Sequence, residues 1–297
     1  MSHDKSVENR SKIIILGSNG FIGSHLESFL KEEFTGYRII GKDLPSLDLT
    51  KFSDVLMLRE LLDSNTIIVM CSAIKKELGD NVENFLKNVL MVSNLSRLLM
   101  ECNIKQFIFF SSAAVYGEET HNMDITEETP ILPTSYYGIA KYTCEILLRK
   151  IQFQRKFKLV IIRPPVIYGP GDQFQYGPSG FIKAALNEAK IVLWGDGNEK
   201  REFVFVDDIV QVVAKIILSQ YEGVVNVATG KSHTFIEIIG TLSSAIERIV
   251  EYSSKERTRK KVDHYFNNKK LLKLFPEIKF TELEVGMKKI INGLKQT

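Results

Sequence analysis

Short apolar runs rich in β-branched residues alternate with amphipathic stretches along the first half of the chain. Nearly continuous apolar runs are typical of strands buried on both faces of a parallel sheet. The runs cover residues 12–16, 38–41, 66–71, 106–110 and 159–163. Helical spacing of apolar positions marks the intervening stretches 21–31, 52–62, 81–101 and 136–154. This alternation predicts an α/β protein with a doubly wound parallel sheet covered by helices.

The second half of the chain has a different pattern, because glycines and prolines gather over residues 164–180. Such a passage leads a chain out of a sheet. Two later apolar runs, 203–206 and 224–227, predict further strands, and the rest is mostly helical. We expect a disordered leader (1–11), a sheet domain (12–170, with 203–229 returning to it) and a smaller, mainly helical C-terminal lobe (171–202 and 230–297).

Composition excludes several classes of protein. The 297 residues are 44% hydrophobic and 25% charged, with a net charge of only +3, which argues against nucleic-acid binding. Three cysteines do not make a disulfide framework, and the five histidines lack metal-ligand spacing, so we expect no metal. No apolar stretch approaches the ~20 residues of a membrane helix. We expect a soluble, cytoplasmic protein that binds no membrane. The basic run 255–261 we interpret as a solvated face, with a phosphate-binding patch as the alternative.

A glycine-rich turn follows the first predicted strand and leads directly into a helix. Gly17 permits the tight turn, Gly20 lets the backbone approach a pyrophosphate, and Gly23 allows close packing of helix on strand. The helix N-terminus adds amide donors and a positive dipole end. This context predicts a Rossmann-type dinucleotide site, whose turn also contains Asn19, Phe21 and Ile22.

An acidic residue is expected about 20 positions later, where it binds the adenosine ribose. Asp43, at the end of the second predicted strand, fits this role and favours NAD over NADP, because a carboxylate repels the 2′-phosphate. Lys42 beside it is able to accommodate that phosphate, so NADP remains an alternative. Asp48 either contacts the adenine edge or caps the next helix. Lys75 lies either near the cofactor phosphates or on the surface.

A tyrosine and a lysine four residues apart, Tyr137 and Lys141, share one face of a predicted helix. A tyrosine with an ordinary pKa near ~10 is a poor base at neutral pH, and a neighbouring cation lowers that pKa. Ser112 lies at the carboxyl end of the predicted strand 106–110, where such folds bind ligands. The residues alone leave Ser111 as an alternative to Ser112.

These motifs together resemble the extended branch of the short-chain dehydrogenase/reductase superfamily, in particular the NAD-dependent nucleotide-sugar epimerase/dehydratase family. The resemblance implies Ser112, Tyr137 and Lys141 as catalytic residues, with Ser112 also holding the substrate. It further implies Arg201, in the segment 194–208, as the residue that grips the substrate's diphosphate. The family's 4,6-dehydratases carry Asp and Glu after the catalytic Ser or Thr, where this chain has Ala113 and Ala114. Dehydration is therefore not expected.

The resemblance implies an enzyme that acts on a nucleotide-diphosphate sugar with NAD as cofactor. We favour a 4-epimerase that works through a transient 4-keto sugar. An NAD(P)H-dependent 4-ketoreductase of a nucleotide-linked deoxysugar uses the same residues and is the alternative. A non-catalytic dinucleotide sensor or structural subunit is a weaker alternative, because the Ser, Tyr and Lys are all present. The helix predicted over 81–101 resembles one by which family members dimerise, so we expect a homodimer.

Overall fold

The structure is a computed structural model that describes residues 11–117, 122–173, 177–258 and 260–295. Two compact units divide the chain. The sheet unit comprises the described residues up to Val115 together with Pro133–Arg163 and Val213–Val225. The second unit comprises Tyr116–Leu132, Pro164–Val212 and the residues from Asn226 onward. The predicted leader, except Ser11, lies outside the described residues.

The sheet unit is built on a six-stranded sheet in the order β10-β6-β4-β3-β1-β2. Its strands are β1 (Lys12–Leu16), β2 (Arg38–Lys42), β3 (Thr66–Met70), β4 (Gln106–Phe110), β6 (Lys158–Arg163) and β10 (Gly223–Asn226). The pairs from β2 through β6 are all parallel. The next two strands along the chain pair with opposite edges of β1, β2 on one side and β3 on the other. The strand order therefore reverses at β1. This is the switch point at which doubly wound folds bind ligands.

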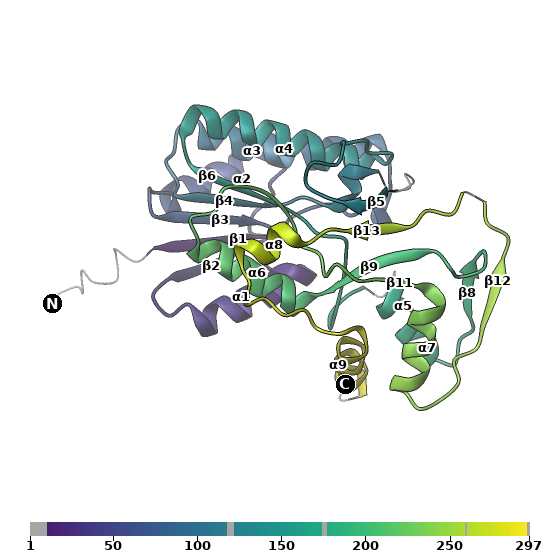
Figure 1. Ribbon diagram of the computed structural model, residues 1–297. Coiled ribbons are helices and arrows are strands. Elements are labelled where there is room, and N and C mark those ends of the chain that lie inside the picture. The colour runs from purple at the N-terminus through teal and green to yellow at the C-terminus, as the bar shows by residue number, and fades with distance from the viewer. Residues whose placement is uncertain (1–10, 118–121, 174–176, 259, 296–297) are drawn as a thin grey trace. The chain divides into compact units, whose positions relative to one another are not determined.

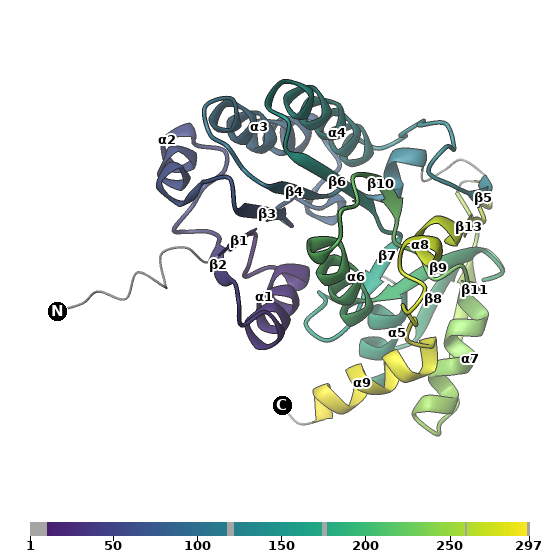
Figure 2. The same cartoon turned by 60° about the vertical axis from the view of Figure 1, so that its left-hand side comes forward.

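Helices cover both faces of this sheet (Figures 1 and 2). They are α1 (Phe21–Glu33), α2 (Phe52–Leu56), α3 (Val82–Leu99) and α4 (Tyr136–Arg155). Short 3₁₀ turns, η1 (Met57–Leu61), η2 (Lys76–Leu78) and η3 (Ala113–Tyr116), extend the connections. In both views α2, α3 and α4 lie on one face of the sheet and α1 lies on the other. The buried core between α3, α4 and the sheet includes Leu95, Leu99, Phe107 and Leu148.

The predicted elements of the first half are confirmed, two of the strands without any shift of boundary. Residues 52–62 form a short α-helix followed by a 3₁₀ turn rather than one helix. The Met57 amide donates to the carbonyls of Asp54 and Val55, which tightens the winding at that point.

The second unit combines short strands with helices. Its strands are β5 (Asn122–Ile125), β7 (Val166–Tyr168), β8 (Ile191–Trp194), β9 (Lys200–Phe205), β11 (Ser232–Thr234), β12 (Tyr252–Lys255) and β13 (His264–Phe266). Its helices are α5 (Gly177–Leu186), α7 (Phe235–Ala245), α8 (Lys269–Leu274) and α9 (Leu283–Lys295). The boundary between the units falls inside α6 (Val206–Leu218). A β-carbon on Gly286 of α9 would lie 2.3 Å from the Tyr168 hydroxyl, so this helix packs tightly on β7.

The domain boundaries differ from the expected ones at one place in particular. Residues 203–229 were expected to return to the main sheet, but β9 pairs with β7 and β11 in a separate three-stranded sheet. Only Val213–Val225 of that stretch belongs to the sheet unit. An apolar run indicates that a strand forms and does not indicate which strand it pairs with. Among the described residues, no helix is both long and apolar enough to cross a membrane.

Candidate active site

The glycine turn between β1 and α1 is tightly constrained. Gly17 has a φ of +89°, and a β-carbon there would lie 2.7 Å from the Ser72 amide nitrogen. At Gly23 a β-carbon would lie 2.0 Å from the Gly17 carbonyl oxygen. Helix α1 begins at Phe21 with Gly20 as its N-cap, and no side chain caps it. The turn is therefore closely packed on the protein side, and the amides at the N-terminus of α1 have no capping side chain.

Asp43 lies beside this turn, directly after β2. Its carboxylate accepts hydrogen bonds from the amides of Asn19 (2.9 Å) and Leu44 (2.7 Å). The acidic residue is thus fixed against the glycine turn, in the position from which it can bind a ribose. Lys75 approaches the same turn from the loop after β3, with its Nζ 5.7 Å from the centre of the Phe21 ring.

Asp48 has a local structural role. Its carboxylate accepts hydrogen bonds from the Thr50 amide (3.0 Å) and the Thr50 hydroxyl (2.6 Å). Both bonds lower the pKa of Asp48, and the bond from the Thr50 hydroxyl has the larger effect. The N-cap of α2 is Lys51, so Asp48 stabilises the turn just before the helix rather than capping it.

Tyr137 and Lys141 lie in the first two turns of α4. The Lys141 ammonium donates to the Phe110 carbonyl (2.7 Å) and lies 5.6 Å from the centre of the Tyr137 ring. Lys141 is only 4% exposed, and this burial lowers its pKa to about 8, although Cys144, Cys71 and Glu145 act in the opposite direction. A cation held in so dry a place interacts strongly with a neighbouring phenolate.

Two contacts fix the N-terminus of this helix. The Ser135 hydroxyl accepts from the Gly138 amide (3.0 Å), and the Asp80 carboxylate accepts from the Tyr137 amide (3.0 Å). A β-carbon on Gly138 would lie 2.6 Å from the Ala114 carbonyl oxygen. Glycine at this position therefore lets the turn that follows Ser112 lie directly against the turn of α4 that holds Tyr137.

The two serines after β4 differ in their surroundings. Ser111 is buried, and its hydroxyl donates to the Glu145 carboxylate at 2.5 Å. Ser112 is half-buried, and its hydroxyl oxygen accepts from the Ala114 amide at 3.1 Å. The Ser111 hydroxyl is already committed to an internal partner, so Ser112 is the better placed of the two to meet a substrate.

Arg201 lies on β9 in the second unit. Its guanidinium pairs with the Glu199 carboxylate and donates to the Val262 carbonyl. Arg257 pairs with the same carboxylate, so two guanidinium groups converge on Glu199. Arg257 was expected to lie on a solvated face, but its side chain is only 16% exposed. The sequence of the basic run 255–261 does not indicate that Arg257 is buried.

An exposed aromatic side chain lies beside these two arginines. Trp194 ends β8 and is 50% exposed, with the Lys255 ammonium 3.4 Å from the centre of a ring. Gly195 follows with a φ of +71°, and a β-carbon on it would lie 2.7 Å from the Arg257 guanidinium. The chain therefore passes directly from the exposed Trp194 to a glycine that lies against Arg257.

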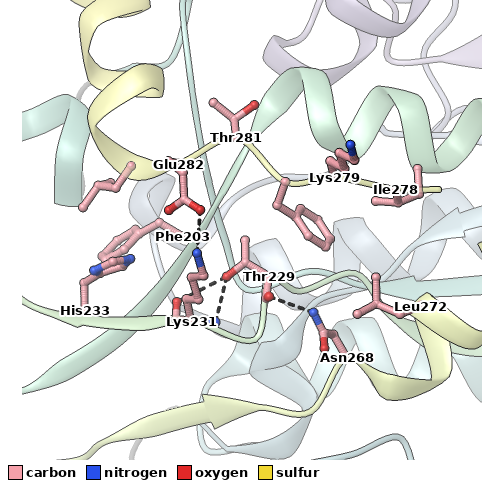
Figure 3. A pocket seen from close by; sticks show the side chains of 12 residues that line it. Phe203, Thr229, Lys231, His233, Asn268, Leu272, Ile278, Lys279, Thr281 and Glu282 are labelled. Carbon is pink, nitrogen blue, oxygen red and sulfur yellow. Dashed lines mark hydrogen bonds and ion pairs between the residues drawn. The ribbon is translucent and has the colours of Figure 1, made fainter. Parts of the chain in front are cut away.

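A pocket of about 400 Å³ lies elsewhere in the second unit. Figure 3 shows the side chains around it, among them Thr229, Lys231 and His233 on one side and Glu282 on another. Lys231 pairs with Glu282 at 2.5 Å, which places an exposed ion pair at the edge of the pocket. No residue predicted from the sequence as a site residue lines it. In the part of the chain that the structure describes, no cluster of three or more His, Cys, Asp or Glu side chains suits a metal ion.

Comparisons with known proteins agree with this arrangement. The sequence profile of the NAD dependent epimerase/dehydratase family matches residues 13–228. A putative UDP-glucose 4-epimerase of Methanocaldococcus jannaschii is 29% identical, over 98% of this chain and 93% of its own. A dTDP-D-glucose 4,6-dehydratase of Dictyostelium discoideum is 27% identical, over 73% of this chain and 58% of its own. The Thermus thermophilus UDP-glucose 4-epimerase in complex with NAD shares the fold, with a TM-score of 0.84 and 24% identity over 96% of this chain and 99% of that one.

Proposed function

Since this chain belongs to the NAD dependent epimerase/dehydratase family, we propose that it is a 4-epimerase of a nucleotide-diphosphate sugar. The reaction passes through a transient 4-keto sugar. The observation that carries this proposal is the buried Lys141 ammonium beside the Tyr137 ring, close to the turn that begins at Ser112.

The glycine turn and its surroundings fit a dinucleotide. β-carbons at Gly17 and Gly23 would collide with neighbouring backbone, so only glycine allows this tight turn before α1. The N-terminus of α1 would offer its amides to phosphates, and Asp43 its carboxylate to a ribose. NAD held there would supply the hydride acceptor of the first half-reaction and, once reduced, the hydride donor of the second. Asp43 favours NAD, and NADP is the alternative cofactor.

The proton chemistry belongs to the protein's own side chains. The Tyr137 phenolate oxygen takes the proton from the sugar's C4 hydroxyl and later gives it back. The Lys141 ammonium stabilises the phenolate, so that Tyr137 acts as a base near neutral pH. The Ser112 hydroxyl holds the same sugar oxygen by a hydrogen bond. The Tyr137 oxygen is therefore the only proton carrier that the two half-reactions require.

Arg201 and Arg257 are the groups we assign to the substrate's diphosphate. A planar guanidinium binds phosphate oxygens in bidentate fashion and keeps its charge at any relevant pH. Trp194, one residue before the glycine that lies against Arg257, offers an exposed aromatic surface on which the nucleotide base can stack. The sugar then extends from this anchor.

Dehydration is disfavoured, although a 4,6-dehydratase is among the relatives. Removal of water across the sugar ring needs an acid and a base next to the catalytic hydroxyl. Ala113 and Ala114 follow Ser112 here, and a methyl side chain neither donates nor accepts a proton.

The competing function is a 4-ketoreductase, for which the same three residues serve. An epimerase keeps its hydride between half-reactions, whereas a reductase exchanges its cofactor in every turnover. Acid release of the cofactor from purified protein distinguishes the two. About one NAD per chain supports the epimerase, and an empty site that binds NADPH reversibly supports the reductase.

Catalysis itself is tested with Tyr137→Phe, with Tyr136→Phe as the matched control. Tyr136 is 42% exposed and lies one position along the helix. Loss of turnover only in the Tyr137 variant is expected. Wild-type turnover in the Tyr137 variant would refute the mechanism, and an absence of any turnover with intact cofactor binding would favour a non-catalytic dinucleotide sensor.

The homodimer is a further part of the proposal. On α3, Val82, Leu86 and Leu90 recur at helical spacing and are 51%, 57% and 43% exposed. On α4, which packs beside α3 (Figure 1), Ile146 and Phe153 are 52% and 81% exposed. An apolar face of this kind on two adjacent helices suits the same face of a second copy, related by a two-fold axis.

A further inference from the structure

A buried ion pair lies directly behind the candidate catalytic residues. Glu145, on α4, is fully buried and accepts two hydrogen bonds from Arg163 at the end of β6, Nε at 2.9 Å and Nη2 at 2.5 Å. The Ser111 hydroxyl at the end of β4 donates to the same carboxylate at 2.5 Å. One carboxylate thus joins the catalytic helix to the ends of two neighbouring strands.

This arrangement is hard to explain by stability alone. Removing two charges from water is unfavourable, and apolar side chains of similar volume often stabilise such a site equally well. A bidentate pair does fix the geometry, because the guanidinium donates its two parallel hydrogen bonds to the carboxylate in one orientation. A device of this kind is useful where a catalytic group must be held in place.

The network adjoins two of the candidate catalytic residues, Ser112 and Lys141. Ser111 immediately precedes Ser112, and its own amide donates to the Ile162 carbonyl of β6 at 2.9 Å. Both the backbone and the side chain of Ser111 are therefore held. Glu145 lies one helical turn after Lys141, on the same face of α4.

The charge of Glu145 also acts on Lys141. The titratable groups that face the Lys141 ammonium are Tyr137, Cys144 and Glu145 on α4 and Cys71 just after β3. Burial lowers the pKa of Lys141, and the carboxylate of Glu145, which also pairs with Arg163, opposes that change. Without this carboxylate the ammonium would lose its proton at lower pH.

We propose that Glu145, Arg163 and Ser111 are positioning residues for the catalytic residues Ser112 and Lys141. They hold α4 in register with the strand end that carries Ser112, and they place a negative charge one turn from Lys141. This inference rests on the proposed roles of Ser112, Tyr137 and Lys141.

Two variants test the two parts of the proposal. Ser111→Ala removes only the hydroxyl that joins β4 to α4. We expect kcat to fall about tenfold, with little change in KM, because Ser112 would be held less firmly against the reacting oxygen while the groups that bind the substrate stay unchanged. Glu145→Gln keeps the shape and removes the charge. Its alkaline loss of kcat should move to lower pH, because the carboxylate that opposes the lowered pKa of Lys141 is gone.

The control is Ser96→Ala. Ser96 is a buried serine on α3 whose hydroxyl has no hydrogen-bond partner within the described part of the chain. It should leave kcat and the pH profile unchanged. If Ser111→Ala behaves like this control when corrected for folded protein, Ser111 is merely structural and that part of the proposal is overturned.

Glu145→Gln removes the carboxylate that pairs with the Arg163 guanidinium, so it carries a risk of misfolding. Glu145→Gln combined with Arg163→Met removes both charges and should fold. The alkaline limb should move in the same direction but less far, because loss of the Arg163 cation partly offsets loss of the carboxylate. An unshifted limb in the folded double variant would overturn the electrostatic part.

A measurement without substrate separates this proposal from the proposed function. The pKa of Lys141 is followed by NMR in protein labelled with ¹³C-lysine, with Lys141→Met used for assignment. A lower Lys141 pKa in the double variant supports the network even if no nucleotide sugar is turned over. An unchanged pKa overturns the electrostatic part even if the wild-type protein is a fully active epimerase.

Discussion

Replacing Asp43 is the sharpest test of the cofactor site, because the structure separates its two roles. Its carboxylate is available to the hydroxyls of a ribose, and it also accepts the Asn19 amide of the glycine turn. Asp43→Ala removes both interactions. Asp43→Asn keeps one oxygen acceptor for the Asn19 amide of the turn, and it removes the charge and the acceptor of the Leu44 amide.

The expected magnitude follows from the type of hydrogen bond lost. A bond from a neutral hydroxyl to an ionised carboxylate contributes about 1.5–3 kcal/mol, which corresponds to roughly 10- to 150-fold in affinity. Asp43→Ala should therefore weaken NAD binding by at least about tenfold. NADP binding should weaken less or improve, because the repulsion between the carboxylate and the 2′-phosphate is lost as well.

Calorimetric titration of cofactor-free protein with NAD and with NADP measures both affinities. Asp48→Ala is the matched control: its carboxylate is held by Thr50, and we expect the ratio of NAD to NADP affinity to stay at the wild-type value. Equal weakening of both cofactors in Asp43→Asn would show that Asp43 does not meet the ribose. Equal weakening in Asp43→Ala alone would show that its main role is to support the glycine turn.

Three other changes give clear expectations. Gly23→Ala should lower the melting temperature and abolish NAD binding, because its β-carbon would lie 2.0 Å from a backbone oxygen; unchanged melting and binding would contradict the tight packing of the turn. Leu86→Glu with Leu90→Glu should convert a dimer into a monomer in light scattering after gel filtration, and a wild-type mass would exclude this face as the interface. Lys141→Met should abolish turnover and raise thermal stability at pH 7, since burial of the ammonium is unfavourable there; a less stable variant would show that the hydrogen bond to the Phe110 carbonyl outweighs the burial.

The sheet and its glycine turn could be predicted from the sequence because the relevant signals are local. Strand β4 is buried at every position, and its continuous apolar run reports this directly. The turn at Gly17 requires a positive φ that favours glycine, so the residue itself reports the backbone conformation. The spacing of Tyr137 and Lys141 places both on one helical face by geometry alone.

Features that depend on contacts distant along the chain could not be predicted in this way. The sequence does not show that β9 pairs with β7 rather than with the main sheet. It also gives no sign that Arg257 and Arg201 share Glu199, because the two arginines are separated by more than fifty positions. The network of Glu145 was missed for the same reason, since Glu145 on α4, Arg163 on β6 and Ser111 after β4 come from separate parts of the chain.

The burial of Lys141 connects the stability of the fold to its chemistry. Because the pKa is lowered from 10.5 to about 8, the unfolded chain binds the extra proton between those values. Stability from this group therefore rises as pH increases from about 8 to about 10.5, and its unfavourable contribution is complete below pH 8. The proposed chemistry needs the opposite condition, because Lys141 must be charged to stabilise the Tyr137 phenolate. The protein then works in the pH range in which its buried lysine is destabilising, and the carboxylate of Glu145, one turn away, reduces that conflict without removing it.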